Sequence, residues 1–226
     1  TDVGTTITTQ GDILYRDGSG LQRLAKGTAG QALKMNTAAN APEWGTISSD
    51  FVKLSTVTAS AVASVSFDGF FTSDYDWYQV MYNGYPSSDT QLEIRFRRSD
   101  ADVTAANYEW VAGGVEGHSG QVNIDQCDRA FSNDKMRPAS FNNLEGGNSN
   151  GEWGFNGHCW IYRPLATDIN PSLSGQISYK SSNSSSVHSY IHTGALVDNQ
   201  TALSGVTFFT PSGTQTGKYT LYGLKS

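Results

Sequence analysis

Histidines and cysteines are the first candidates for chemistry in this sequence of 226 residues. His188 and His192 are four residues apart in VHSYIHTG, where the surrounding Val, Tyr and Ile favour a strand. On a strand the two imidazoles share a face but stand about 13 Å apart, too far to bind one metal ion. The spacing of Cys127 and Cys159 matches no zinc motif. We therefore expect no metal and no cofactor, and two free buried thiols, although a single disulfide stays open.

Closely spaced aspartates raise the question of glycosidase chemistry, which needs two carboxyl groups about 5–10 Å apart. Nothing in the sequence brings two of them together across a groove, and aspartates in turns usually accept hydrogen bonds from their own backbone. Calcium binding by the same oxygen atoms stays open, without any EF-hand spacing. We expect a protein that is not an enzyme and has no catalytic residue. The pairs are Asp74 and Asp76, Asp100 and Asp102, and Asp125 and Asp128.

Aromatic rings beside polar loops are candidates for carbohydrate binding, because exposed rings stack on the faces of sugars. Most of the five tryptophans are expected in the core, but two of them adjoin Gly- and Asn-rich stretches, where binding residues collect. With their polar neighbours, they form the predicted glycan-binding set of Trp110, Trp153, Glu152 and Asn156.

The charge pattern argues against nucleic acid and membrane as partners. The formal net charge is −6, and the densest basic cluster is only Arg95, Arg97 and Arg98, with Glu93 beside it. We interpret these arginines as solvated strand residues rather than a phosphate site, so no nucleic-acid partner is expected. No stretch approaches the ~20 apolar residues of a membrane-spanning helix, and no secretion signal is expected.

The elements that must position these residues are short strands. The sequence is 37% hydrophobic, 12% aromatic and only 16% charged, which suits many strands joined by tight turns. TQLEIRFRRS alternates cleanly and points Leu92, Ile94 and Phe96 toward a core. DRAFSNDKMRPASFNNLEG is the most loop-like stretch. We predict an all-β chain in which residues 51–226 form a jelly-roll-like β-sandwich.

Residues 1–50 differ from the rest, because five-residue apolar segments alternate there with glycine-bearing turns. Asp17-Gly18 between apolar runs is a strong hairpin signal, yet isolated hairpins are marginal in water. The segment has too few large apolar side chains to enclose a core. We therefore predict a β-hairpin attachment or trimerisation segment that packs against copies of itself or a docking partner. The predicted interface residues are Ile13, Leu14, Tyr15, Leu21, Leu24, Leu33, Met35 and Trp44.

A family resemblance is carried by residues 11–44, GDILYRDGSGLQRLAKGTAGQALKMNTAANAPEW. This stretch resembles a module in virion proteins of tailed bacteriophages. The segments VSFDGFFTSDYDWYQVMYNG, TQLEIRFRRSDADVTAANYEW and LSGVTFFTPSGTQTGKYTLYGLK are similar to the C-terminal domains of such proteins. Together they cover most of the chain.

The resemblance implies a structural component of a tailed-phage particle, a homotrimeric tail fibre, spike or head fibre on the virion surface. Its N-terminal segment would dock on another virion protein, such as the capsid, a portal or adaptor, or the tail. Its β domain would project outward and meet host-surface carbohydrate. Two alternatives stay open, a tailspike enzyme that degrades polysaccharide and a purely protective capsid decoration protein.

Overall fold

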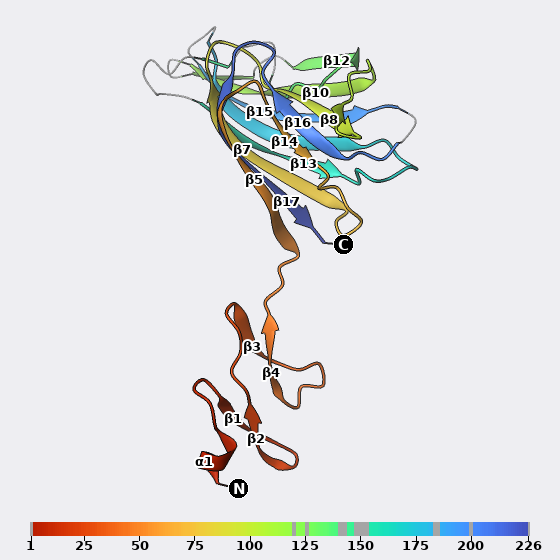
Figure 1. The fold of residues 1–226 in the computed structure, drawn as a ribbon. Helices are drawn as coiled ribbons and strands as arrows, with labels where there is room; N and C mark the ends of the chain where they lie inside the picture. Colours follow the sequence, from red (N-terminus) through yellow and green to blue (C-terminus); the bar gives the residue numbers. More distant parts are fainter. Residues whose placement is uncertain are drawn as a thin grey trace. The chain divides into compact units, whose positions relative to one another are not determined.

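The computed structural model describes residues 2–118, 121–124, 127–139, 144–146, 154–182, 186–198 and 201–225. The chain divides into two compact units, Thr1–Ser49 and Asp50–Ser226. Apart from one short helix, α1 (Val3–Thr6), the regular elements of the described residues are antiparallel strands (Figure 1). The all-β prediction is confirmed.

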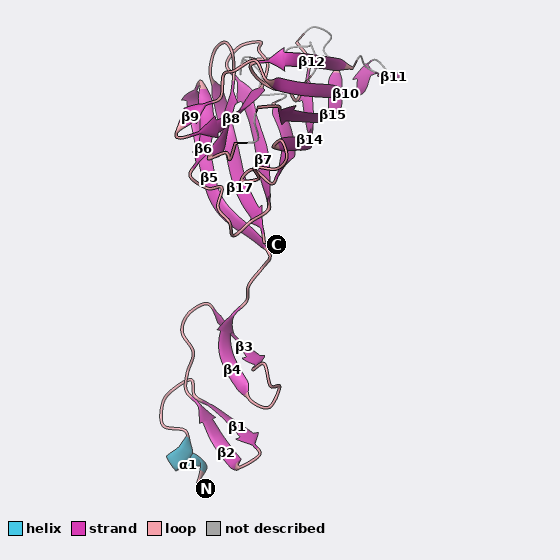
Figure 2. Cartoon of the chain, turned by 90° about the vertical axis from the view of Figure 1, so that its right-hand side faces the viewer, coloured by secondary structure: helices cyan, strands magenta, loops and turns pink. Residues whose placement is uncertain are grey.

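The N-terminal unit contains two separate hairpins (Figure 2). The first pairs β1 (Ile13–Asp17) with β2 (Gly20–Leu24), and the second pairs β3 (Gln31–Met35) with β4 (Pro42–Thr46). Asp17 closes the first turn by accepting hydrogen bonds from the backbone N–H groups of Ser19 and Gly20 at 2.7 and 2.9 Å. Gly20 has a positive φ of 140°, which suits glycine.

Polar contacts and one indole ring hold the loops of this unit. Asp12 accepts a hydrogen bond from Arg23 Nε at 2.7 Å, and this bond is the main reason that the pKa of Asp12 falls to about 2. Trp44 donates its Nε1–H to the carbonyl oxygen of Ala25 at 2.6 Å. Gly27 lies against the Trp44 ring so closely that a Cβ there would stand 2.7 Å from a ring carbon. None of the residues 2–49 is buried.

The second unit is a sandwich of two sheets that lie face to face (Figure 1). In the large sheet the first and last strands of the unit, β5 (Phe51–Val62) and β17 (Gln215–Leu224), are neighbours, and β17 also pairs with β7 (Trp77–Pro86). In spatial order its strands are β11 (Gln121–Ile124), β10 (Tyr108–His118), β15 (Val187–Leu196), β14 (Ser172–Lys180), β13 (Phe155–Tyr162), β7 (Trp77–Pro86), β17 (Gln215–Leu224) and β5 (Phe51–Val62).

The small sheet covers one face of the large one. Its order is β6 (Ser64–Asp68), β16 (Gly205–Phe209), β8 (Glu93–Arg98) and β9 (Ala101–Asp102). The core between the sheets is rich in rings, including Tyr82, Phe208 and Tyr219, whose centroids lie 5.3–6.1 Å apart. Leu92, just before β8, and Ile94 and Phe96 on β8 are fully buried, as the alternation predicts.

One stretch predicted as a loop contains a strand. Residues Asp128–Asn133 form β12, which pairs with β10. The segment is polar and carries the exposed ring of Phe131, so its own sequence gives little β signal. Its pairing with the edge of β10 decides its conformation. The chain after it adds isolated bridges, at Met136 to Ile94 and at Leu144 to Thr90 and Ser181.

Candidate functional site

One face of the large sheet packs against the small sheet. The opposite face, which we call the open face, is not covered by any other element of the described second unit. On β7 the side chains alternate, so that Tyr78, Val80 and Tyr82 face the core. Gln79, Met81 and Asn83 face the opposite side, since successive strand residues point to opposite faces. The sequence of β7, WYQVMYNGYP, shows this alternation directly.

The register brings polar residues from three strands into rows on this face. Asn83 stands opposite Asn156 on β13 and opposite Lys218 on β17. In the next row Met81 stands opposite His158 and Thr220. Side chains paired in this way have their Cβ atoms about 4.5–5.5 Å apart, so each row forms a contiguous strip.

Two adjoining depressions lie over these rows. One has a volume of about 440 Å³ and is lined by Met81, Tyr82, Asn83, Asn156, Gly157, His158, Lys218, Thr220 and Tyr222. The other has a volume of about 490 Å³ and is lined by Asn83, Gly84, Tyr85, Gly154, Phe155, Asn156, Thr216 and Gly217. Because both contain Asn83 and Asn156, they form one continuous hollow, which we call the β7 groove.

Four polar side chains of the β7 groove have no partner within the described protein, whereas Thr220 shares a hydrogen bond with Thr56 and Thr216 accepts one from the backbone N–H of Ala61. Asn83, Asn156, His158 and Lys218 make no side-chain hydrogen bond and no ion pair to any described residue. No aspartate or glutamate lines either depression. The groove therefore offers two amides, one imidazole and one lysine side chain to solvent. The whole chain, by contrast, has a net charge of −6.

A cluster of aromatic rings continues the open face beyond the groove, formed by Phe51, Trp77, Trp160, Tyr162 and Tyr222 (the aromatic cluster). Phe51 stacks on Tyr222 with ring centroids 4.6 Å apart, and Trp77 meets Tyr162 edge-on at 5.6 Å. Trp160 lies 6.1 Å from Phe51 and 6.5 Å from Trp77. Trp77 is 45% exposed, and it lines a smaller hollow of about 250 Å³ with Asp76, Leu224 and Lys225.

The outcome of the prediction differs among the four predicted glycan-binding residues. Trp110 is only 6% exposed and belongs to the core, so its ring is not presented to a ligand and the prediction for it is wrong. Trp110 is buried because alternate residues of β10 point into the core. The polar loop next to it in the sequence gives no sign of this orientation. Trp153 and Glu152 lie outside the described residues. Asn156 is exposed and lines the β7 groove.

The groove residues that sequence reasoning missed are Asn83, His158 and Lys218. The alternation in β7 and in GHCWIY of β13 gives the side on which Asn83 and His158 lie. The sequence contains no signal that Lys218, more than fifty residues beyond β13, stands in the same row. Only the register between β17 and β7 shows that Lys218 is a neighbour of Asn83.

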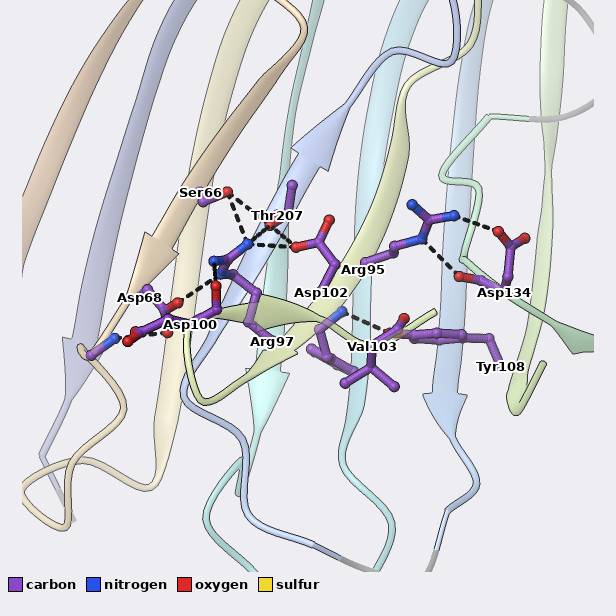
Figure 3. A network of polar contacts seen from close by, with 12 residues as sticks. Ser66, Asp68, Arg95, Arg97, Asp100, Asp102, Val103, Tyr108, Asp134 and Thr207 are labelled. Atoms are coloured by element: carbon purple, nitrogen blue, oxygen red, sulfur yellow. Dashed lines mark hydrogen bonds and ion pairs between the residues drawn. The ribbon is translucent and has the colours of Figure 1, made fainter. Parts of the chain in front are cut away.

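Ion pairs engage the arginine cluster on the small sheet (Figure 3). Arg97 donates to Asp68 on β6 at 2.8 Å and to Asp102 on β9 at 2.6 Å. Arg95 pairs with Asp134, and its guanidinium lies 4.5 Å from the ring centroid of Phe209. Arg98 donates to Asp198 through both terminal nitrogens. These arginines, interpreted from the sequence as solvated, instead join strands and loops across the sheet.

Several acidic residues are likewise held by contacts within the protein. Asp102 accepts from Thr207 at 2.6 Å as well as from Arg97. Glu93 alternates with the inward residues Ile94 and Leu92, which predicts an outward side chain, yet it is 1% exposed because Arg137 covers it with a hydrogen bond of 3.0 Å. Burial raises the pKa of the Asp128 carboxyl above its usual value. Asp125 lies outside the described residues. The described part of the chain holds no group of three or more metal-ligating side chains.

His188 and His192 lie on β15 as expected, and both are buried. Burial, with a smaller contribution from His158, lowers the pKa of His192 to about 3. Neither ring nitrogen of His192 has a hydrogen-bond partner within the described residues. The imidazole is therefore neutral at physiological pH and acts as a packing group.

Both cysteines are free thiols. Cys159 is fully buried on β13, and burial raises its pKa to about 12. Cys127 is exposed, so the expectation of two buried thiols is wrong for this residue. It lies just before β12, at the edge of the large sheet, where few neighbours cover it.

The eight predicted interface residues of the N-terminal unit are all at least partly accessible. Leu21, Leu33 and Met35 are exposed, and Ile13, Leu14, Tyr15, Leu24 and Trp44 are half-buried. Their role in association stays a prediction. Among the described residues no helix is long and apolar enough to cross a membrane. Comparison with protein-family models, curated proteins and solved structures finds no match for this chain.

Proposed function

We propose that this protein is a homotrimeric structural component of a tailed-phage particle. Its N-terminal unit associates with copies of itself and docks on a capsid, portal, adaptor or tail protein, and its β-sandwich projects from the virion surface. One observation carries the proposal, namely that none of the residues 2–49 is buried, the eight large apolar residues of the predicted interface included.

The physical argument concerns the stability of the hairpins. Each N-terminal sheet has only two strands, and such a sheet is marginal in water unless something covers its apolar face. Leu33 is 49% exposed and Met35 is 54% exposed on β3. Complete burial of such side chains contributes about 1.5–3 kcal/mol each, and association of copies provides that burial.

The second unit has no such need, because it already encloses a core of fully buried rings and aliphatic side chains. A division into a dependent attachment segment and a self-sufficient outer domain fits a fibre, a spike or a capsid decoration protein. The resemblance of residues 11–44 to a phage virion module supports the same role and suggests which kind of particle carries it.

The test of association is the mass of the purified protein in solution. Light scattering during gel filtration is expected to give about 73 kDa for the full chain, three times 24.4 kDa. The double variant Leu33→Ser/Met35→Ser and the fragment Asp50–Ser226 are expected to be monomers. Val122→Ser, which alters an even more exposed apolar residue of the second unit, is the control and should stay trimeric. A monomeric full chain would overturn the proposal.

The test of location uses particles. Antibody against the second unit is expected to label intact virions of the phage that encodes the chain, in electron micrographs, at the capsid or the tail. Purified virions that lack the protein would show that the virion role is wrong, whatever the mass in solution.

A further inference from the structure

The β7 groove is shaped and sized for a small ligand. Its two depressions, of about 440 and 490 Å³, each fall within the range of about 300–1,000 Å³ that ligand sites occupy. They follow one another along β7 and share Asn83 and Asn156. A linear molecule of two or more units therefore fits this hollow better than a single compact one.

The side chains in the shared floor suit hydroxyl groups. An amide both donates and accepts hydrogen bonds, as a sugar hydroxyl does. Asn83 and Asn156 stand opposite each other on neighbouring strands, and the structure gives neither side chain a partner among the described residues. Two adjacent unengaged amides on a rigid sheet form a preorganised pair, because strands hold them in place without loop ordering.

The charge of the groove selects an acidic ligand. Lys218 stands beside Asn83, and His158 follows Asn156 on the same face of β13. No carboxylate lines the groove to pair with either side chain. Elsewhere in the described structure cationic side chains of the second unit commonly pair with acids, as Arg97, Arg98 and Arg137 do. An unpaired lysine in the groove lining complements an anion.

Aromatic rings stand at one end of the groove. Tyr222 lines it, and Trp160 lies two residues beyond His158 on the same side of β13. Both belong to the aromatic cluster, whose mutual contacts fix the ring planes. Rings held in this way offer an apolar face to the C–H groups of a sugar at low entropic cost.

We propose that the β7 groove binds an acidic oligosaccharide. Asn83 and Asn156 bind its hydroxyl groups, Lys218 and His158 bind its carboxylate, and Tyr222 contacts a sugar face. The inference rests on the proposed function in one respect only, namely that the oligosaccharide lies on a host surface. Binding itself is a property of the purified chain, so it fails or succeeds independently of trimer formation and virion labelling.

A second copy of the chain is the competing occupant of this face. The centre of a protein interface is depleted of charged residues, whereas the groove presents Lys218 beside Asn83. Exposed apolar side chains of the open face lie on β10 and β15, as Val111 and Ile191 do, and the groove lining itself adds Met81 and Tyr85. The charge of Lys218 favours a ligand over a second copy. The experiment below still distinguishes association of two copies through the groove from ligand binding.

The experiment is calorimetric titration of the full-length protein with tri-galacturonate and with sialyllactose, each beside its neutral methyl ester. Saturable binding of at least one acid is expected, with a Kd at or below about 1 mM and at least about tenfold weaker binding of its ester. Absence of binding by both acids up to about 10 mM, or equal binding of acid and ester, would overturn the proposal.

Variants locate the binding. Lys218→Met is expected to weaken binding of the acid about tenfold while the ester is unaffected, and Asn156→Ala is expected to weaken both. Lys53→Met is the matched control, since Lys53 lies on the same face but outside the groove lining. An equal loss in Lys53→Met would show a general effect of surface charge and sink the proposal. A changed oligomer mass in Lys218→Met would identify the groove as an interface between copies, which also overturns it.

Discussion

The hydroxyl of Tyr108 donates a hydrogen bond of 3.0 Å to the carbonyl oxygen of Val103. The same hydroxyl accepts a hydrogen bond of 2.9 Å from the backbone N–H of Phe96 (Figure 3). The ring is fully buried, and burial raises the pKa of the phenol above its usual value. One side chain of the large sheet thus satisfies two backbone groups, one on β8 of the small sheet and one just after β9.

Tyr108→Phe is expected to destabilise the second unit by about 2 kcal/mol. Removal of the hydroxyl leaves a buried donor with no acceptor, and an unmade buried hydrogen bond costs about 1–3 kcal/mol. Urea denaturation followed by tryptophan fluorescence measures the change. Tyr85→Phe, which alters an exposed ring on β7, is the control and should stay within about 0.5 kcal/mol of the parent. A Tyr108→Phe variant as stable as the parent would contradict this role.

Arg97 supports a second prediction, because its guanidinium lies between two carboxylates. The side chains of Arg97, Asp68 and Asp102 are 15%, 19% and 26% exposed. Arg97→Met leaves both acids close together without their cation. Since water still reaches them, we expect a loss of about 2 kcal/mol in the free energy of unfolding, less than the 3–5 kcal/mol of a fully buried pair.

The control for Arg97 is a pair that solvent screens. Arg163 and Asp168 are 3.4 Å apart and are 48% and 68% exposed. Exposed pairs contribute about 0–1 kcal/mol, so Asp168→Asn should change stability little. Equal effects of Arg97→Met and Asp168→Asn in urea denaturation would refute the importance of the Arg97 pairs.

How far the sequence predicts this structure depends on whether the deciding contact is local. Alternation places Leu92, Ile94 and Phe96 correctly because the period of a strand is a local property. The burial of Glu93 depends on Arg137, 44 residues away, and no local pattern reports that contact. The strand β12 is missed for the same reason, since its pairing with β10 outweighs a weak propensity.

For the candidate site too, local alternation predicts some features and long-range contacts decide the others. Alternation shows that Asn83 and His158 share a side of their strands with Met81 and Trp160. That they lie together, with Lys218, depends on the order β13-β7-β17, and strand order is set by long-range packing. Predictions from the neighbourhood of polar loops included Asn156, which lines the groove, but also Trp110, a ring that the core encloses.

His192 makes stability depend on pH. Its pKa is about 3 in the folded chain and 6.5 as a model value, so the unfolded chain binds the proton first as the pH falls. Stability is therefore complete above pH 6.5 and is lost as the pH falls from there toward 3. Between pH 7.5 and 5 the expected loss is about 2 kcal/mol.

The variant His192→Leu isolates this contribution. The raised pKa of Asp128 acts in the opposite direction, since it makes the folded chain bind a proton before the unfolded chain does. Subtraction of the two pH profiles of unfolding free energy removes Asp128 and every other unchanged group. A difference that stays constant between pH 7.5 and 5 would show that His192 does not carry the effect.

The two thiols are expected to differ in reactivity. Thiolate is the reactive form, and the Cys159 thiol is both enclosed on β13 and held protonated by a pKa of about 12. Cys127 is exposed. Titration with a disulfide reagent should therefore release one equivalent per native chain and two in guanidinium. Cys127→Ser should abolish the native equivalent, and Cys159→Ser should leave it. Zero equivalents in guanidinium without reductant would instead reveal a disulfide, which the enclosure of Cys159 and the exposure of Cys127 oppose.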